Sequence, residues 1–198
     1  MIIGALHIPQ GAGRMNVTRV SGPGNSIFQK TSMVEIVNDD KMCLARAIGV
    51  CFARVHKIDS KEEWAEIKRN AGSSDNLGIL IKQRKTSQST YKTICKKTRK
   101  EQGTLAKILC EMAEVSADKP ASLADVGKFE EALQVRIAVV GSSLGNKFVR
   151  VPDKTHPERP ILYLYMTDHE GTSHFHSIVG ITGFFRSVYF CETCFKYQ

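Results

Sequence analysis

The amino-terminal part of the chain is patterned for helices. From Leu44, apolar residues follow at positions i+4, i+7 and i+11, the spacing that lines one face of an α-helix. This pattern predicts a buried helix that begins at or beside Cys43. Ser60 and Glu63 form a capping-box pattern, and Trp64 in that helix is expected to lie in the core. Together with apolar residues at helical spacing farther along, the pattern predicts helices over 60–70, 105–115 and 122–133.

Beyond Gln134 the hydrophobic period changes to two, which is typical of strands. Val135, Ile137 and Val139 alternate with polar or small residues. Similar patterns predict a short strand early in the chain and several late ones, over 33–37, 148–151, 161–167, 174–179 and 188–190. Helices followed by a mostly antiparallel sheet predict a domain of the α+β class.

The two ends of the chain differ from this central part. Glycine and proline are frequent near the start, so 1–32 is expected to be an irregular arm, followed by a domain over 33–190 and a Cys-x-x-Cys tail over 191–198. The longest apolar stretches, such as 161–166, are far shorter than the roughly 20 residues of a membrane span. The first residues also lack the basic segment of a secretory signal. We therefore expect no membrane association and an intracellular location, either cytoplasmic or nuclear.

The net charge of the chain is +8, from 28 lysine and arginine residues against 20 acidic residues. The excess lies between Lys82 and Lys100, where eight basic residues occur without an acid. A run of this kind attracts nucleic acid or the acidic face of a protein, although it also fits a solvated surface. Tyr91 is its one aromatic residue that would stack on a base. The charge pattern thus allows a nucleic-acid partner without requiring one.

The six cysteines are expected to be reduced thiols in an intracellular protein, which favours catalysis or metal binding over disulfides. Cys43 has a position that activates a thiol, because the amides and the dipole at the start of a helix stabilise a thiolate. A thiol hydrolase also needs an imidazole that holds the proton and delivers it to the leaving group. His174, on a predicted strand, has a suitably rigid position.

These two segments resemble a known family. The order Asp-x-x-Cys-Leu-x-Arg-Ala from Asp40 to Ala47, followed by His-aromatic-x-Ser-Ile from His174, resembles the ovarian-tumour (OTU) family of cysteine proteases. Most members of that family are deubiquitinases. Lys41 and Ala45 depart from the family pattern, which has a glycine and an aromatic residue at these two positions.

The resemblance extends over most of the chain. Further shared segments are 10–14, 37–40, 162–164, 183–185 and 189–194. Together they look like the OTU-like region upstream of the polymerase domain in protein-primed DNA polymerases of Maverick/Polinton-type mobile elements. The carboxylate motifs of a polymerase are absent from the sequence. The resemblance therefore implies an OTU-like, papain-type fold with helices packed on the sheet, and it does not imply polymerase activity.

The resemblance also implies roles for single residues. Cys43 would be the nucleophile that attacks the isopeptide carbonyl at the carboxyl end of ubiquitin, and His174 would be the general base and acid. The amides of Cys43 and of the turn from Asp40 to Met42 would stabilise the oxyanion, and Asp40 would shape that turn. Arg46 would tie the helix to neighbouring backbone. No cofactor is implied.

The third catalytic position departs from the family. Many members have Asp or Asn two residues after the histidine, where this chain has His176. Residues i and i+2 of a strand share a face, so His176 would be within reach of the imidazole of His174. A neutral histidine accepts a hydrogen bond without adding negative charge. Acids elsewhere in the chain that would serve instead are Asp39, Asp168 and Glu170.

Cys191 and Cys194 have the spacing of half a zinc site, since a tetrahedral structural zinc needs four ligands. A second pair would have to follow in a longer parent chain. Within these 198 residues we expect an incomplete site and no bound metal.

Three functions remain open at this level. The first is a cysteine isopeptidase that removes ubiquitin or a ubiquitin-like modifier. The second is a catalytically weak OTU-like accessory module that binds nucleic acid through Lys82 to Lys100, and the third is a non-catalytic ubiquitin-binding domain. A thiol-reactive ubiquitin probe separates the first from the other two, and salt-dependent DNA binding tests the second.

Overall fold

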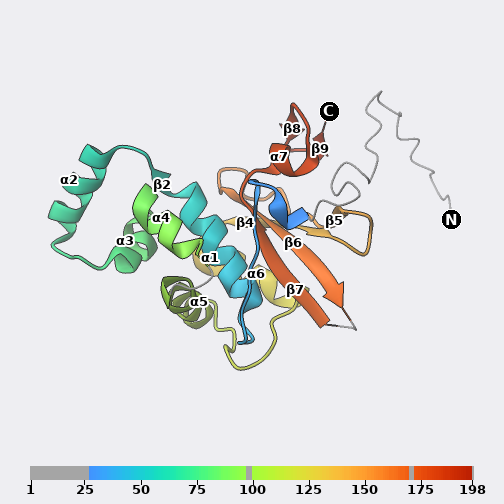
Figure 1. Cartoon of the computed structure of the whole chain (residues 1–198), viewed down its shortest axis with the longest axis horizontal. Coiled ribbons are helices and arrows are strands. Elements are labelled where there is room, and N and C mark those ends of the chain that lie inside the picture. Colours follow the sequence, from blue (N-terminus) through green and yellow to red (C-terminus); the bar gives the residue numbers. More distant parts are fainter. Residues whose placement is uncertain (1–26, 97–99, 170–171, 198) are drawn as a thin grey trace.

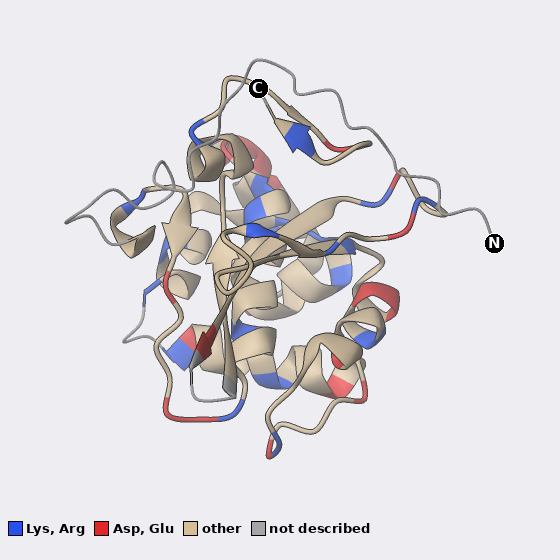
Figure 2. Ribbon diagram, turned by 90° about the vertical axis from the view of Figure 1, so that its right-hand side faces the viewer, with Lys and Arg blue, Asp and Glu red and all other residues tan. Residues whose placement is uncertain are grey.

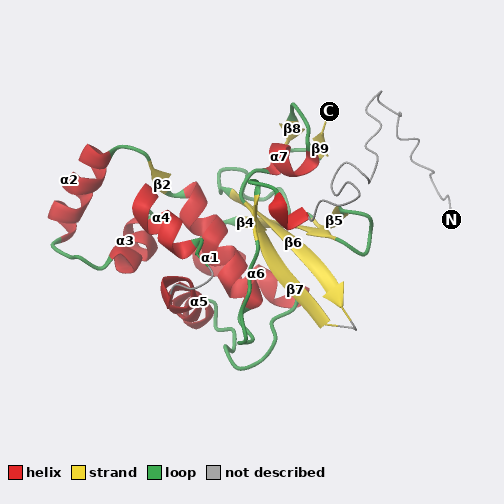
Figure 3. Cartoon of the chain, viewed as in Figure 1, coloured by secondary structure: helices red, strands yellow, loops and turns green. Residues whose placement is uncertain are grey.

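The structure, a computed structural model, describes residues 27–96, 100–169 and 172–197. Glu170 and most of the predicted amino-terminal arm lie outside these residues. Figure 3 shows most of the helices on one side of the molecule and the main sheet on the other. The architecture is mixed α/β and is compatible with the expected α+β class. Among the described residues, no helix has the length and apolar character needed to cross a bilayer.

Helix α1 (Cys43–Val55) forms the centre of the fold. Ten of its thirteen residues are buried, so the predicted buried helix and its start at Cys43 are both confirmed. It packs between strands β6 (Ile161–His169) and β7 (Thr172–Ile178) on one side and helices α4 (Gln88–Ile94) and α5 (Lys100–Met112) on the other (Figure 1). Gly49 permits the close approach to α5, because a Cβ atom at this position would lie 3.1 Å from the Leu105 side chain.

The main sheet has five strands in the order β1-β7-β6-β4-β5. They are β1 (Met33–Val34), β4 (Arg136–Gly141), β5 (Lys147–Arg150), β6 (Ile161–His169) and β7 (Thr172–Ile178). Only the β4–β6 pair is parallel, so the sheet is mostly antiparallel, as the alternation predicted. β1 is shorter than the predicted 33–37, because the chain leaves the ladder after Val34 pairs with Ser177.

The alternation along each strand divides the core between the two faces of the sheet. On β6, Leu162 and Leu164 belong to the core beneath α1, whereas Tyr163 and Tyr165 belong to a second, aromatic cluster on the opposite face. Phe175 on β7 joins the first core, in which it is fully buried. This two-sided packing fixes β7 firmly against α1, and thereby fixes the register of its histidines.

The basic segment, to which the sequence assigned no helix or strand, is largely helical. It spans the end of α3 (Asn76–Gln83), strand β3 (Thr86–Ser87) and helix α4 (Gln88–Ile94), and reaches the start of α5 (Lys100–Met112). β3 pairs in parallel with β2 (Lys57–Ile58) in a separate two-stranded sheet. Residues 97–99 of the segment lie outside the described part. The helix predicted over 122–133 is a 3-10 turn (Leu123–Asp125) followed by α6 (Val126–Leu133).

Helix α2 (Lys61–Ala71) begins as predicted, since the Ser60 hydroxyl accepts a hydrogen bond from the amide of Glu63. It nevertheless has no buried residue, and Trp64 is only half-buried. The expected core position of Trp64 is therefore wrong. Figure 1 shows the reason, because α2 projects from the far end of the helical side, away from the sheet.

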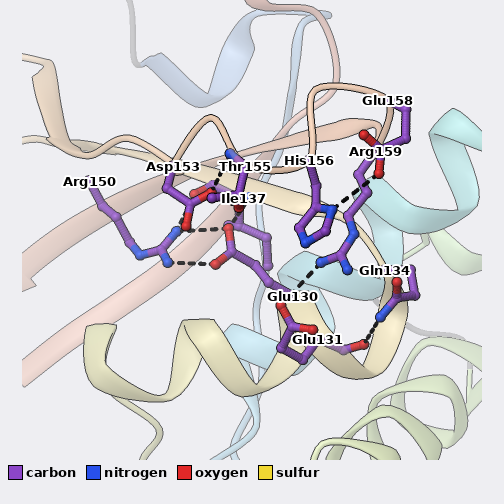
Figure 4. Close-up of polar contacts among 10 residues, drawn as sticks. All are labelled: Glu130, Glu131, Gln134, Ile137, Arg150, Asp153, Thr155, His156, Glu158 and Arg159. Carbon is purple, nitrogen blue, oxygen red and sulfur yellow. Dashed lines mark hydrogen bonds and ion pairs between the residues drawn. The ribbon is translucent and has the colours of Figure 1, made fainter.

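A largely buried ion pair fastens α6 to strands β4 and β5. Arg150 donates to both carboxylate oxygens of Glu130, at 3.0 and 2.6 Å, and to the carbonyl of Ile137 at 2.5 Å. Glu130 in turn accepts from the amide of Ile137 at 2.6 Å (Figure 4). Removing one partner would leave an uncompensated charge in a partly buried position, which is strongly destabilising. This ion pair is a structural feature at the β5 edge of the sheet.

Both ends of the described chain pack on the aromatic face of the sheet. A 3-10 turn (Ile27–Gln29) lies within the predicted arm and buries Ile27. At the other end, α7 (Ile181–Phe185) precedes a hairpin of β8 (Phe190–Cys191) and β9 (Lys196–Tyr197). Phe190 belongs to the same aromatic cluster, so the Cys-x-x-Cys tail forms a hairpin packed against the domain.

Candidate active site

Cys43 is the first residue of α1, and its thiol meets the edge of β7. Hydrogen bonding from the backbone of Phe175 and of Leu44 helps to lower the pKa of this thiol. The backbone of Phe175 is available for this because β1 stops pairing with β7 at Ser177, which leaves this part of the strand edge to the helix start. Cys43 retains 8% of its surface exposed. The thiol is therefore held among hydrogen-bond donors.

The thiol of Cys43 and the imidazole of His174 act on each other, and each shifts the pKa of the other. Burial by itself would raise the pKa of Cys43, but the hydrogen bonds from His174 and from the Phe175 amide outweigh it and lower the pKa below its ordinary value. The bond to Cys43 raises the pKa of His174 above its ordinary value, against desolvation. Both shifts favour the thiolate–imidazolium form of the pair.

The other side of the His174 ring is fixed by backbone. Its Nε2 lies 3.0 Å from the carbonyl oxygen of Ile36. A carbonyl only accepts, so Nε2 carries a proton, which leaves Nδ1 as the ring nitrogen available to the thiol of Cys43. Ile36 is 1% exposed and is anchored by its own side chain in the core.

His176 lies beside His174 with the ring centroids 4.7 Å apart. Its Nδ1 accepts a hydrogen bond from the amide of Ile36 at 3.2 Å, and its Nε2 lies 3.4 Å from the hydroxyl of Thr167. Phe28 packs on the ring at 4.5 Å. The two histidines thus share a face of β7, as predicted, and the ring nitrogens of His176 contact Ile36 and Thr167.

Asp40 organises the turn before Cys43. Its carboxylate accepts from Arg46 Nε at 3.0 and 3.2 Å and from a second guanidinium nitrogen, and from the amide of Met42 at 3.0 Å. Asn38 donates to the same carboxylate at 2.7 Å. Although desolvation opposes it, the bond from Arg46 lowers the pKa of Asp40. Arg46 also donates to Gln102 on α5 at 3.3 Å, so the turn is tied to two helices.

This network leaves fewer backbone amides available for the expected oxyanion hole. The amide of Met42 is engaged by the Asp40 carboxylate, so it is not available to an oxyanion as the resemblance had implied. The amide of Cys43 belongs to the first turn of a helix and has no acceptor within the helix ladder. It is the backbone donor closest in sequence to the thiol that can serve a developing negative charge. Arg46 holds the Asp40 side chain, and not backbone as the resemblance had implied.

Of the acids proposed for the third position, Asp39 and Asp168 have no hydrogen bond to the imidazole among the described residues, and Glu170 lies outside them. Asp168 accepts from the hydroxyls of Ser143 and Ser173 at 2.9 and 2.7 Å. Asp39 is exposed. The acid whose charge acts on His174 is Glu35, which helps to raise the pKa of this histidine. Sequence reasoning missed Glu35 because the strand was expected to continue through it.

The other cysteines differ in their surroundings. Burial raises the pKa of Cys51 to about 12 and that of Cys110 to about 11, and it raises the pKa of Cys95. In the β8–β9 hairpin, the amide and thiol of Cys194 lower the pKa of Cys191 to about 7. Among the described residues, no group of three or more His, Cys, Asp or Glu side chains is arranged to hold a metal.

A cavity of about 410 Å³ lies beside the Asp40 turn. Lys100 and Lys107 of α5 line it together with Asp39, and neither lysine has an ion-pair partner within the described part of the chain. Cys43 and His174 do not line it. The cavity therefore neighbours the reactive pair without containing it.

The basic segment is exposed at its lysines but not at its aromatic residue. Lys82, Lys92 and Lys96 are exposed, whereas Tyr91 is half-buried, with the guanidinium of Arg54 5.9 Å from its ring centroid. Figure 2 shows basic residues on several elements of the molecule, with acidic residues between them. The ring of Tyr91 is thus engaged within the fold, and the case for nucleic acid rests on charge.

Searches against protein-family models, curated proteins and solved structures each return no match for this chain.

Proposed function

We propose that this chain is a cysteine isopeptidase that cleaves ubiquitin or a ubiquitin-like modifier from conjugates. The observation that carries the proposal is the position of Cys43 as the first residue of α1, beside a His174 ring whose Nε2 is held 3.0 Å from the carbonyl of Ile36. The two groups shift each other's pKa in opposite directions, so that the pKa of the thiol is lowered and that of the imidazole is raised. Such opposed shifts are typical of an activated thiol nucleophile and its general base. The choice of a ubiquitin-type substrate comes from the resemblance of the Asp40–Ala47 and His174 segments to the OTU family.

The pair is suited to acyl transfer. The Cys43 thiolate attacks the carbonyl carbon, and the resulting oxyanion is stabilised by the amide of Cys43. His174 then donates its proton to the leaving lysine amine, the C–N bond breaks, and a thioester remains on Cys43. A water molecule, deprotonated by His174, attacks the thioester and releases the carboxylate. The proton that His174 acquires restores the initial thiolate–imidazolium pair.

The test is covalent capture by ubiquitin that carries a carboxyl-terminal electrophile. We expect one adduct, on Cys43, found by intact mass and peptide mapping. Cys43→Ala should form no adduct, and Cys51→Ala is the matched control on the same helix, which should still react. A panel of ubiquitin-like probes identifies the modifier. Reaction of Cys43 with a small alkylator but with no probe of the panel would contradict the isopeptidase proposal.

The accessory-module alternative retains one observation in its favour, the exposed lysines at residues 82, 92 and 96. Binding through these lysines would weaken steeply as salt rises, because phosphate contacts release counterions. Titration of labelled single- and double-stranded DNA at several salt concentrations tests this alternative. Binding that is unaffected when Lys92 and Lys96 are changed to Glu would count against it.

A further inference from the structure

The two histidines of β7 hold the same residue from opposite sides. The β1–β7 ladder ends where Val34 pairs with Ser177, and the next residues of the chain turn away from β7. At Ile36 both backbone groups are nevertheless bonded to β7 side chains. The amide donates to Nδ1 of His176 at 3.2 Å, and the carbonyl accepts from Nε2 of His174 at 3.0 Å. Histidine side chains thus replace the missing ladder bonds.

We propose that the carbonyl of Ile36 takes the place of the orienting acid for His174, and that His176 is a positioning residue that holds this carbonyl through the Ile36 amide. The inference rests on the proposed function, in which His174 is the general base. His176 therefore acts on His174 through one residue of backbone, and not by a direct hydrogen bond.

The chemistry of the ring nitrogens supports this arrangement. An orienting group must accept a hydrogen bond from one imidazole nitrogen so that the other faces the nucleophile, and the carbonyl of Ile36 meets this requirement. Nδ1 of His176 accepts from an amide and so carries no proton, which places the proton of the neutral ring on Nε2. That nitrogen faces the hydroxyl of Thr167, whose own hydrogen is directed to the carbonyl of His174.

A carbonyl dipole stabilises an imidazolium less than a carboxylate does. The negative charges that act on His174 are those of the Cys43 thiolate and of Glu35, and the neighbouring ring of His176 accepts from Ile36 in its neutral form. Protonation of His176 at Nδ1 would bring two N–H donors face to face at Ile36. The position of the Ile36 carbonyl therefore depends on a neutral His176.

Two substitutions test the roles of the two ring nitrogens of His176 separately. In His176→Asn the side-chain oxygen lies where Nδ1 lies, so it still accepts from the Ile36 amide. In His176→Gln the polar group lies nearer to the position of Nε2 and Thr167, and the Ile36 amide loses its acceptor. We expect kcat on a fluorogenic ubiquitin substrate to fall about 10- to 100-fold in the Gln variant, as for other misplaced catalytic groups, and to be largely retained in the Asn variant.

A second readout requires no substrate. The rate at which iodoacetamide modifies Cys43 is measured against pH, with Cys191 and Cys194 changed to Ser in every protein, and the His174 and His176 tautomers are assigned from imidazole ¹⁵N shifts. We expect the His174 Nε2–H and His176 Nε2–H tautomers in the neutral rings of the wild type. The alkylation profile should shift in the Gln variant and not in the Asn variant.

These readouts separate the inference from the proposed function. If ubiquitin substrates are not cleaved but the tautomers and the alkylation profiles are as expected, the positioning of His174 by the carbonyl of Ile36 is supported and the isopeptidase proposal fails. An Nδ1–H tautomer of His174, or profiles that are the same in the wild type and the Gln variant, would overturn the inference. Thermal unfolding of each variant shows whether kcat falls only because the protein unfolds. In that case the alkylation profile of the folded fraction would be unchanged, and this result would also overturn the inference.

Discussion

The two ends of helix α1 give two cysteines opposite chemistry. Cys43 and Cys51 both lie on the buried side of the helix and both contact β7 or its neighbour. The Cys43 sulfur faces donors, namely the amides of Phe175 and Leu44 and the imidazole of His174, whereas the Cys51 sulfur faces the carbonyls of Tyr163 and Ile178 at 3.3 and 3.8 Å. Burial opposes the thiolate at both, yet the pKa falls at Cys43 and rises to about 12 at Cys51.

The comparison teaches that burial and hydrogen bonding together decide the pKa of a thiol, since burial dominates at Cys51 and hydrogen bonding outweighs burial at Cys43. The start of a helix presents unpaired amides, which stabilise an anion. Cys51 lies farther along α1, where its thiol is fully within the core and donates to the carbonyls of Tyr163 and Ile178 on the neighbouring strands. A buried cysteine in a helix is therefore no guide to reactivity until its end of the helix and its partners are known.

The largest expected effect comes from replacing each of the two cysteines of α1 by alanine. Cys43→Ala should reduce turnover of a ubiquitin substrate more than about 1,000-fold, because the nucleophile is gone. Cys51→Ala should keep turnover while lowering the free energy of unfolding by about 1 kcal/mol, through a small cavity. Steady-state kinetics and denaturant unfolding check both. Turnover that survives in Cys43→Ala would contradict the predicted difference between Cys43 and Cys51.

The pH dependence of thiol modification sharpens the comparison next. In a Cys191→Ser/Cys194→Ser protein, Cys43 should react with iodoacetamide at a pH below about 8.5, the ordinary pKa of a thiol, while Cys51 stays unmodified. His174→Gln removes the main partner of the Cys43 thiol but leaves the thiol buried, so the pH midpoint of its modification should rise. Each unit by which this midpoint rises reduces the modification rate at pH 6 about 10-fold. Peptide mapping after timed modification measures this.

The same shifts have a consequence for stability. Because the folded pKa of Cys43 is lowered, its contribution to stability is present above the unfolded pKa and is lost as the pH falls through the folded value. Because the folded pKa of His174 is raised, its contribution is present below the unfolded pKa and is lost as the pH rises through the folded value. The contribution of Cys43 is therefore complete on the alkaline side and that of His174 on the acid side. The difference in the free energy of unfolding between wild type and His174→Gln, measured at several pH values, should show the His174 contribution shrink as the pH rises.

Asp40→Asn should give a smaller effect at the reactive end of α1. It keeps the shape of the side chain but removes the charge that pairs with the mostly buried Arg46, so the free energy of unfolding should fall by about 1 to 3 kcal/mol. The lowered pKa of Asp40 means that this difference is present above pH 4 and vanishes as the wild-type carboxylate is protonated at lower pH. A double-mutant cycle with Arg46→Gln isolates the pair. An unchanged stability would show that Asn38 and Met42 suffice to hold the turn.

The smallest effect is expected from the exposed lysines beyond the Cys51 end. Lys92→Glu with Lys96→Glu should leave Cys43 alkylation unchanged within about 2-fold, because exposed charges are screened beyond roughly 8 Å at physiological ionic strength. Binding of an acidic partner should weaken, more at low salt than at high salt. A matched change in Cys43 reactivity would mean that the two ends of α1 are coupled.

Much of the reactive end of α1 follows from local sequence. The spacing of Leu44 and the apolar residues after it is enough to place Cys43 at a helix start, and the alternation around Phe175 is enough to place His174 and His176 on one face of a strand. Where the sequence was silent or wrong, the missing information was not local. Trp64 follows the helix pattern, yet α2 contacts the short strands β2 and β3 and has no buried residue. The basic segment is helical although its charges obscure the apolar positions.

By itself the sequence determined the candidate pair, since helix and strand periodicities depend on residues close together in the chain. Only the tertiary structure decided what faces each ring nitrogen, that Met42 is engaged by Asp40, and that the amide and carbonyl of Ile36 lie between the two histidines. The physical reason is that backbone donors and acceptors are the same in every residue type. No pattern of side chains marks which peptide group will orient an imidazole until the strands and the helix are packed together.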